Sequence, residues 1–288
     1  MTEQRVIGHT NGTNGSSYSL DWTVFANTID GKQVQTAKTR HSINPANGEP
    51  GPDVPVSTSE DVENAMVSAQ KGFAAWSIVP WEERKEATLA FASGLKHEKD
   101  NFVNMLTREQ GKPLFVAGME LDLAISFIET VASLVLPEER YQNGQTETVV
   151  RYTPLGVCVG IVPWNFPILL ACGKLASAVM TGNSIILKPS PFTPAGDLKL
   201  VELAQRYFPP GVVQCLSGGD DLGPLLTAHA IPAKISFTGS TFTGKKVMES
   251  ASKTLKRVTL ELGGNDPTVI LDDIDIDTVA PKDGPQFL

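Results

Sequence analysis

Apolar positions in the first half of the chain recur with a helical period. Between residues 62 and 73 they fall three or four apart, at Val62, Ala65, Met66, Ala69 and Phe73. Ser59 precedes this run as a candidate N-cap, followed by the acidic first-turn residues Glu60 and Asp61. Helical patterns continue through 81–110 and 114–136. We therefore predict a helical N-terminal part.

From Gly156 onward, short Val- and Ile-rich runs alternate with helical patterns. The predicted strands are 156–162, 184–188, 212–216, 233–237, 257–260 and 268–271. The predicted helices are 166–180, 195–207, a short one after 221, and 241–254. This alternation predicts an α/β fold with a doubly wound, mainly parallel, Rossmann-like sheet and helices on both faces.

The remaining segments are rich in turn formers or in extended patterns. Residues 1–19 carry many Gly, Asn, Ser and Thr residues, which predicts a disordered N-terminus. Residues 43–57 predict a loop with short edge strands. Residues 145–155 predict extended strands broken at Pro154.

Composition and charge narrow the class of partner. Of 288 residues, 41% are hydrophobic, enough to build the core of one large domain or two smaller ones. The formal net charge is -8 without any basic stripe, so we expect no nucleic-acid partner. No apolar stretch is long enough to span a bilayer, and no secretory signal opens the chain, so we expect no membrane partner.

Cysteine and histidine usage predicts a cytoplasmic protein without a metal site. The three cysteines, Cys158, Cys172 and Cys215, lie far apart and form no C-x-x-C pair, which is typical of a reducing compartment. The four histidines show no metal-ligand spacing.

Polar residues follow each predicted strand, where an open α/β sheet binds its ligands. The strand ends are followed by PWNFP (163–167), KPS (188–190), SGGDDLG (217–223), TGS (238–240) and ELGG (261–264). One rim thus gathers an amide, a lysine, free glycine N–H groups, a hydroxyl and a carboxylate, which can contact sugar hydroxyls and phosphates. The common G-x-G-x-x-G fingerprint and a Tyr-x-x-x-Lys pair are both absent.

A phosphate-binding loop is an alternative interpretation of residues 239–246. GSTFTGKK matches G-x-x-x-x-G-K between a predicted strand and a predicted helix, but Lys246 stands where Ser or Thr would bind Mg²⁺. The pattern leaves open a P-loop NTPase, although the missing hydroxyl removes a metal ligand. On the other interpretation, Ser240 caps a helix whose N-terminus receives a diphosphate.

Taken together, PWNFP, KPS, FTGS and ELGG in this order resemble the aldehyde dehydrogenase superfamily, from about Ile43 to Asp277. The resemblance implies an enzyme that oxidises an aldehyde to a carboxylic acid with NAD(P). It implies that residues 20–144 are the helical N-terminal part of the coenzyme domain and that 145–155 supply oligomerisation strands. Residues 156–273 are then the Rossmann-like core.

The resemblance also assigns roles to individual residues. Asn165 resembles the neutral side-chain donor of an oxyanion hole. Glu261 resembles the general base that activates water to hydrolyse a thioester, and we expect apolar surroundings to raise its pKa. The implied coenzyme-binding residues are Ile161, Val162, Pro163, Trp164, Lys188, Ser190, Gly219, Gly223, Phe237, Gly239, Ser240, Thr243, Leu262 and Gly263.

Coenzyme choice departs from the family pattern. Many members have a glutamate three residues after the lysine, where it holds the adenosine ribose, and Pro191 stands there in this chain. Without that carboxylate a 2′-phosphate meets less repulsion. NAD is the first choice of cofactor, and NADP stays open.

The chain departs further from the family pattern in the position of its cysteines. The family's thiolate attacks the aldehyde from a cysteine a few tens of residues after ELGG, whereas all three cysteines here precede Glu261. We expect each of the three cysteines to be a small, buried residue of the hydrophobic core. We therefore expect residues 274–288 to be a truncated tail, the catalytic domain to be absent and the chain to lack turnover.

The expected partners follow from that truncation. A small aldehyde is the substrate of a complete enzyme. The resemblance implies a homo-oligomer. We do not expect one here, because the resemblance also implies that the strand that pairs with the 145–155 strands to complete the oligomerisation arm is missing from this chain. The alternative is a non-catalytic NAD(P)-binding module or pseudoenzyme that associates with a full-length homologue.

Overall fold

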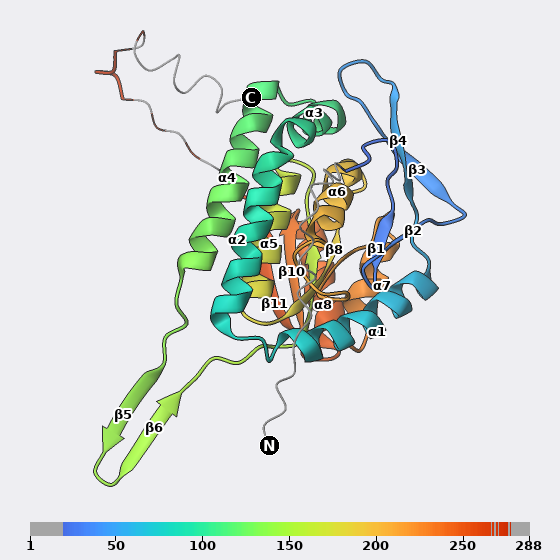
Figure 1. Ribbon diagram of the computed structural model, residues 1–288. Coiled ribbons are helices and arrows are strands. Elements are labelled where there is room, and N and C mark those ends of the chain that lie inside the picture. The colour runs from blue at the N-terminus through green and yellow to red at the C-terminus, as the bar shows by residue number, and fades with distance from the viewer. Residues whose placement is uncertain (1–19, 266, 268, 270, 276, 278–288) are drawn as a thin grey trace.

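A mostly parallel seven-stranded sheet forms the centre of the computed structural model, which describes residues 20–265, 267, 269, 271–275 and 277 (Figure 1). Its strand order is β11-β10-β7-β8-β9-β1-β2. The strands are β1 (Asn27–Ile29), β2 (Lys32–Val34), β7 (Val157–Ile161), β8 (Ser184–Lys188), β9 (Val213–Cys215), β10 (Lys234–Gly239) and β11 (Arg257–Leu262). Strands β7 to β11 pair in parallel, so the predicted α/β fold is confirmed.

Helices cover both faces of the sheet. They are α1 (Ser59–Trp76), α2 (Trp81–His97), α3 (Lys99–Gln110), α4 (Leu114–Ser133), α5 (Pro167–Met180), α6 (Pro194–Ala204), α7 (Leu222–Ala228) and α8 (Thr241–Ser252). Buried side chains of α2 to α6 form one core with Cys158, Ile185 and Leu187 of the sheet. Those of α1, α7 and α8 form a second core with Val159 and Ile186. Because side chains alternate along a strand, the two cores lie on opposite faces.

An antiparallel hairpin extends one edge of the sheet, which the sequence analysis did not predict. Strand β1 pairs with β2 and, through Thr28 and Cys215, with β9. The hairpin turn is Asp30-Gly31, and both residues have positive φ (52° and 74°). An Asp-Gly pair suits such a turn because both central residues must adopt φ above zero. Three-residue strands leave little periodic signal in a sequence.

Several predicted boundaries shift in the structure. Helix α1 is capped by Thr58, not by Ser59, because the Thr58 hydroxyl and the Asp61 carboxylate form a reciprocal capping box. The helical pattern over 81–110 is two helices that meet at Glu98. The predicted helix over 114–136 ends at Ser133. Strand β11 continues to Leu262, so Glu261 lies within the strand, not after it.

Two further hairpins lie outside the central sheet. Strands β3 (Thr39–Ile43) and β4 (Pro50–Pro55) pair near the segment predicted to be loop with edge strands. Strands β5 (Glu139–Asn143) and β6 (Thr146–Val150) form a hairpin that projects away from the helices (Figure 1). The strands predicted for 145–155 therefore begin earlier than expected, and nothing after Val150 is strand until β7.

Some predictions lie outside the described residues. They include the disorder of 1–19 and most of the tail over 274–288, and the predicted strand 268–271 contains two such residues. Among the described helices, none is long and apolar enough to cross a membrane.

Candidate active site

A cavity of about 470 Å³ lies on the α7/α8 face of the sheet and collects five of the predicted coenzyme-binding residues. These are Ile161, Lys188, Gly223, Phe237 and Thr243. They come from the ends of β7 and β8, from β10, and from the first turns of α7 and α8. The parallel order of the sheet brings them together, since the carboxyl ends of parallel strands share one edge.

Lys188 is a buried cation that has N–H donors available for a ligand. Only 5% of the residue is exposed, and its Nζ donates to the Pro189 carbonyl at 3.2 Å. Burial lowers the pKa of Lys188, against the attraction of the nearby Asp220 carboxylate. An ammonium has three N–H donors, so this contact leaves others that can reach a ligand in the cavity.

The N-terminus of α8 adds a second polar element. Ser240 is the N-cap, and its hydroxyl accepts from the Thr243 backbone N–H at 3.2 Å. Both residues are exposed. The first N–H groups of a twelve-residue helix and its dipole favour an anion at this end.

The other predicted coenzyme-binding residues lie around the same sheet edge without lining this cavity. They are Val162, Pro163, Trp164, Ser190, Gly219, Gly239, Ser240, Leu262 and Gly263. Val162 and Ser190 are buried, whereas Trp164 is 53% exposed. A Cβ at Gly239 would lie 2.7 Å from the Phe237 ring, so packing within β10 alone accounts for that glycine.

A second cavity, of about 670 Å³, contains Glu261 and lies on the opposite face of β10 and β11. Ser236 and Thr238 line it, and they alternate along β10 with Phe237 of the first cavity. Thr238 and Glu261 are paired in the parallel register. The residue expected to act as base and the coenzyme cavity are therefore on opposite faces of the sheet, near the shared carboxyl end of β10.

The prediction that Glu261 lies in apolar surroundings is wrong. Glu261 is exposed on β11, the edge strand of the sheet. The sequence prediction failed here because the run VTLEL resembles a strand buried on both faces, whereas α8 packs on one face of β11 and the alternating residues Arg257, Thr259 and Glu261 line the second cavity.

Lys174 is a polar residue of the second cavity that the sequence analysis missed. Its Nζ donates to Ser236 Oγ at 3.2 Å and to Thr238 Oγ1 at 2.8 Å. Burial lowers the pKa of Lys174 to about 8, while the Glu261 carboxylate opposes that shift. The signal was present, because Lys174 is the one charged residue in PILLACGKLASAVM.

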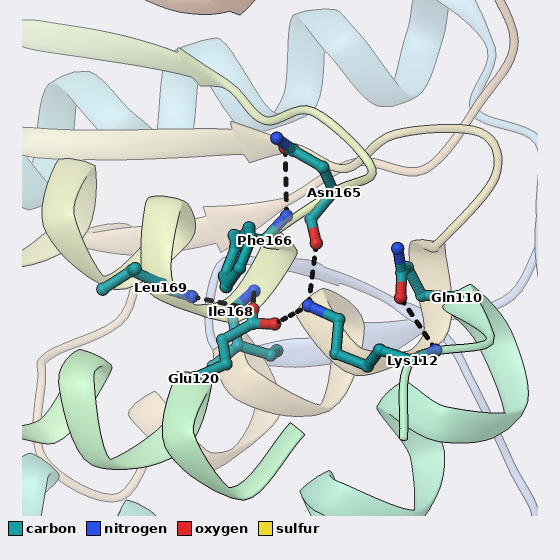
Figure 2. Close-up of polar contacts among 7 residues, drawn as sticks. All are labelled: Gln110, Lys112, Glu120, Asn165, Phe166, Ile168 and Leu169. Carbon is teal, nitrogen blue, oxygen red and sulfur yellow. Dashed lines mark hydrogen bonds and ion pairs between the residues drawn. The ribbon is translucent and has the colours of Figure 1, made fainter. Parts of the chain in front are cut away.

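Asn165 lies in the exposed loop between β7 and α5 (Figure 2). Its Oδ1 accepts from the Phe166 backbone N–H at 3.0 Å, and its carbonyl accepts from Lys112 Nζ at 2.8 Å. With its oxygen held in the loop, the side-chain amide keeps its N–H₂ group for another acceptor.

A buried ion pair supports this loop from the helical layer. Lys112 Nζ pairs with the Glu120 carboxylate, whose other oxygen accepts from the backbone N–H groups of Ile168 (2.9 Å) and Leu169 (3.2 Å) (Figure 2). Lys112 also lies 4.0 Å from the centre of the Phe166 ring. Burial raises the pKa of Glu120, against the opposing effect of Lys112. No sequence pattern joins these residues, because Lys112 precedes the helix that carries Glu120.

The three cysteines are free and buried, as expected. Burial raises the pKa of Cys158 to about 12 and raises those of Cys172 and Cys215 well above the ordinary thiol value. A protonated, enclosed thiol is a poor nucleophile. Among the described residues, no three His, Cys, Asp or Glu side chains gather to hold a metal ion.

A Rossmann-like sheet with a cavity at its carboxyl edge is the arrangement typical of nucleotide-binding α/β proteins. The profile of the aldehyde dehydrogenase family matches residues 32–282. The chain belongs to the aldehyde dehydrogenase family, and the NTPase alternative is not supported.

Relatives and solved structures agree with this assignment. Aldehyde dehydrogenase LUC3 of a Fusarium species is 41% identical over 262 residues, covering 91% of this chain and 56% of that protein. Betaine aldehyde dehydrogenase of Vibrio vulnificus is 39% identical over 88% of this chain and 54% of its own length. The crystal structure of Staphylococcus aureus betaine aldehyde dehydrogenase in complex with NAD+ is similar with a TM-score of 0.85 and 32% identity, covering 88% of this chain and 53% of that one. The chain thus spans about half the length of the relatives it matches.

Proposed function

We propose that this chain is the coenzyme-binding part of an NAD(P)-dependent enzyme that oxidises an aldehyde to a carboxylic acid. The observation that carries the proposal is the cavity at the carboxyl edge of the sheet, which collects Lys188 and four further residues that the motifs assign to the coenzyme. The similar Staphylococcus aureus enzyme was crystallised in complex with NAD+.

The residues present fit a dinucleotide. Pro224, Phe237 and Val247 give the cavity apolar walls for an adenine ring, and Lys188 offers N–H donors to ribose hydroxyls. The N-terminus of α8 offers backbone N–H groups to a diphosphate. Bound NAD(P)+ would supply the acceptor for the hydride that leaves the aldehyde carbon.

The residues proposed for the chemistry lie on the other side of the same edge. Asn165 would donate its side-chain N–H to the oxygen of the reacting carbonyl, where negative charge develops; such a donor contributes about 3 kcal/mol. Glu261 would take a proton from the water that releases the acid. The Lys112–Glu120 pair would hold the Asn165 loop in place.

Cys158, Cys172 and Cys215 are all buried, and burial raises the pKa of each, so none of them readily offers the thiolate that forms an acyl intermediate; Cys158 alone borders the cavity that contains Glu261. We therefore propose that residues 1–288 alone bind coenzyme without turning over aldehyde. The second candidate, a non-catalytic coenzyme-binding module that works with a full-length homologue, is favoured by the same burial. The exposed β5–β6 hairpin would be the surface for that association or for a homo-oligomer.

Isothermal titration calorimetry with NAD+ and NADP+ tests the proposal. Saturable binding of at least one coenzyme, weakened more than tenfold by Lys188→Ala, is the expected result. Binding of neither coenzyme to folded protein would contradict it. Both candidates predict no aldehyde-dependent NAD(P)H formation by the chain alone. Stable association with a full-length homologue, measured by co-purification, would favour the second candidate, and its absence would favour the first. Three free cysteines further support a reducing, cytoplasmic setting.

A further inference from the structure

Asp220 introduces a second charge at the lysine end of the coenzyme cavity. It follows β9 in the loop that begins at Leu216, and it lines the cavity together with Lys188. Among the charged groups that act on the Lys188 ammonium, Asp220 has the largest effect. The side chain is exposed, so its carboxylate is accessible to a ligand.

Arg40 carries the positive charge that acts most on the Lys188 ammonium. Its Nη1 donates to the Gly218 carbonyl at 3.3 Å, and Arg40 does not line the cavity. Two other lysines do line it. Lys246 lies 4.3 Å from the centre of the Phe242 ring, and Lys253 follows the last turn of α8, at the opposite end of that helix from Ser240. Glu249 of α8 also lines the cavity, but Asp220 is the lining carboxylate that acts on the Lys188 ammonium. A group on a sugar bound by Lys188 would therefore meet the charge of Asp220.

A carboxylate at such a place has a definite chemical preference. It accepts hydrogen bonds from the 2′- and 3′-hydroxyl groups of a ribose, and it repels a 2′-phosphate. Pro191, which follows β8, offers neither contact and does not line the cavity. The loop after β9 thus supplies the acidic group that the loop after β8 lacks.

We propose that Asp220 receives the adenosine ribose hydroxyls and excludes a 2′-phosphate, so that this cavity selects NAD+ over NADP+. The inference rests on the proposed function, because it takes Lys188 to contact the adenosine ribose. It resolves the coenzyme choice that position 191 leaves open.

The decisive comparison uses ligands that differ only in the 2′-phosphate. Dissociation constants for 5′-AMP and 2′,5′-ADP, and for NAD+ and NADP+, are measured by calorimetry on the 288-residue chain at two salt concentrations. Wild type should bind the 2′-phosphorylated member of each pair at least tenfold more weakly. Asp220→Asn keeps the size and an acceptor oxygen but removes the charge, and it should lower this discrimination at least fivefold. Higher salt should lower the discrimination in wild type, because screening weakens charge repulsion.

Asp221→Asn is the matched control. It removes the same charge at the next residue, but Asp221 acts on Lys188 less than Asp220 does and does not line the cavity, so discrimination should change less than twofold. Equal binding of both members of a pair by wild type, an unchanged ratio in Asp220→Asn, or an equal effect of Asp221→Asn would each overturn the inference and leave the proposed function intact. Failure of folded wild type to bind NAD+, NADP+ and 5′-AMP would instead overturn the proposed function itself.

Discussion

Lys112 and Glu120 form a buried ion pair that joins the start of α4 to the loop carrying Asn165. The side chains are 6% and 0% exposed, so neither charge is solvated by water. The Glu120 carboxylate also satisfies two backbone N–H groups in the first turn of α5. One carboxylate thus fixes the position of a lysine, a helix end and the proposed oxyanion donor (Figure 2).

Removing that carboxylate should destabilise the protein strongly. Glu120→Ala leaves the Lys112 ammonium buried without a counter-charge and two N–H groups without an acceptor, which costs about 3–5 kcal/mol. Urea unfolding followed by circular dichroism measures the change. Asp122→Ala is the control on the same helix: its ion pair with Lys99 spans 2.6 Å but is solvent-exposed, so its loss should cost less than about 1 kcal/mol. Equal effects of the two substitutions would contradict the importance assigned to the buried pair.

Glu109 should make the fold less stable as pH rises towards neutrality. Burial raises its folded-state pKa from 4.5 to about 7, although the backbone N–H groups of Ala195 and Gly196 and the Ser42 hydroxyl oppose the shift. The folded state therefore binds more protons than the unfolded state between these values, and the free energy of unfolding falls as pH rises through this window, by about 3 kcal/mol in total. Burial also raises the pKa of Asp197, in the same direction.

Glu109→Gln should flatten the pH dependence of the free energy of unfolding between pH 4.5 and 7. Urea titrations at half-unit pH intervals measure the slope. Glu129→Gln, at an exposed position of α4, should keep the wild-type slope. A wild-type protein whose stability rises steadily across this interval would show that Glu109 folds as a charged group.

The sequence predicted those parts of the fold and site that depend on local pattern. Buried parallel strands are continuous apolar runs, as in SIILK, and their ends are marked by polar motifs, so the sheet and residues such as Lys188 were predictable. The Lys112–Glu120 pair was not, because it depends on how α4 packs against α5. The exposure of Glu261 was missed for a similar reason: a single strand does not reveal whether it lies at the edge of the sheet. The SGGDDLG segment placed Asp220 on the same rim as Lys188, but only the cavity shows that the two residues line one site.

Ser240 should contribute separately to the stability of α8 and to coenzyme affinity. Ser240→Ala removes the acceptor for the Thr243 N–H and should cost about 1 kcal/mol of stability as well as affinity for NAD+. Ser240→Asp keeps the cap and suits the helix dipole, so stability should be retained, but its charge should repel the coenzyme diphosphate and weaken NAD+ binding further. Thermal unfolding and calorimetry distinguish the two effects.

Thr58→Ala is the control for that comparison. It removes the cap of α1, which contributes no residue to the coenzyme cavity, so it should lower stability and leave NAD+ affinity unchanged while the protein is folded. If Ser240→Asp bound NAD+ as tightly as wild type, the diphosphate could not lie at the α8 N-terminus.

The cysteines should not react with thiol reagents in the folded protein. Cys158, Cys172 and Cys215 are buried, and burial raises the pKa of each, so almost no thiolate forms at pH 8. With Ellman's reagent, folded protein should release no thionitrobenzoate on the timescale of minutes, and protein in 6 M guanidinium should release three equivalents, one from each cysteine in the sequence. NAD+ should leave the folded-state result unchanged. A single thiol that reacts within seconds in the folded protein would contradict the burial of all three, and mass spectrometry of the modified peptide would identify it. Cys158 is the one cysteine of the three that lines the cavity containing Glu261. A reactive Cys158 would therefore be a candidate nucleophile within this chain.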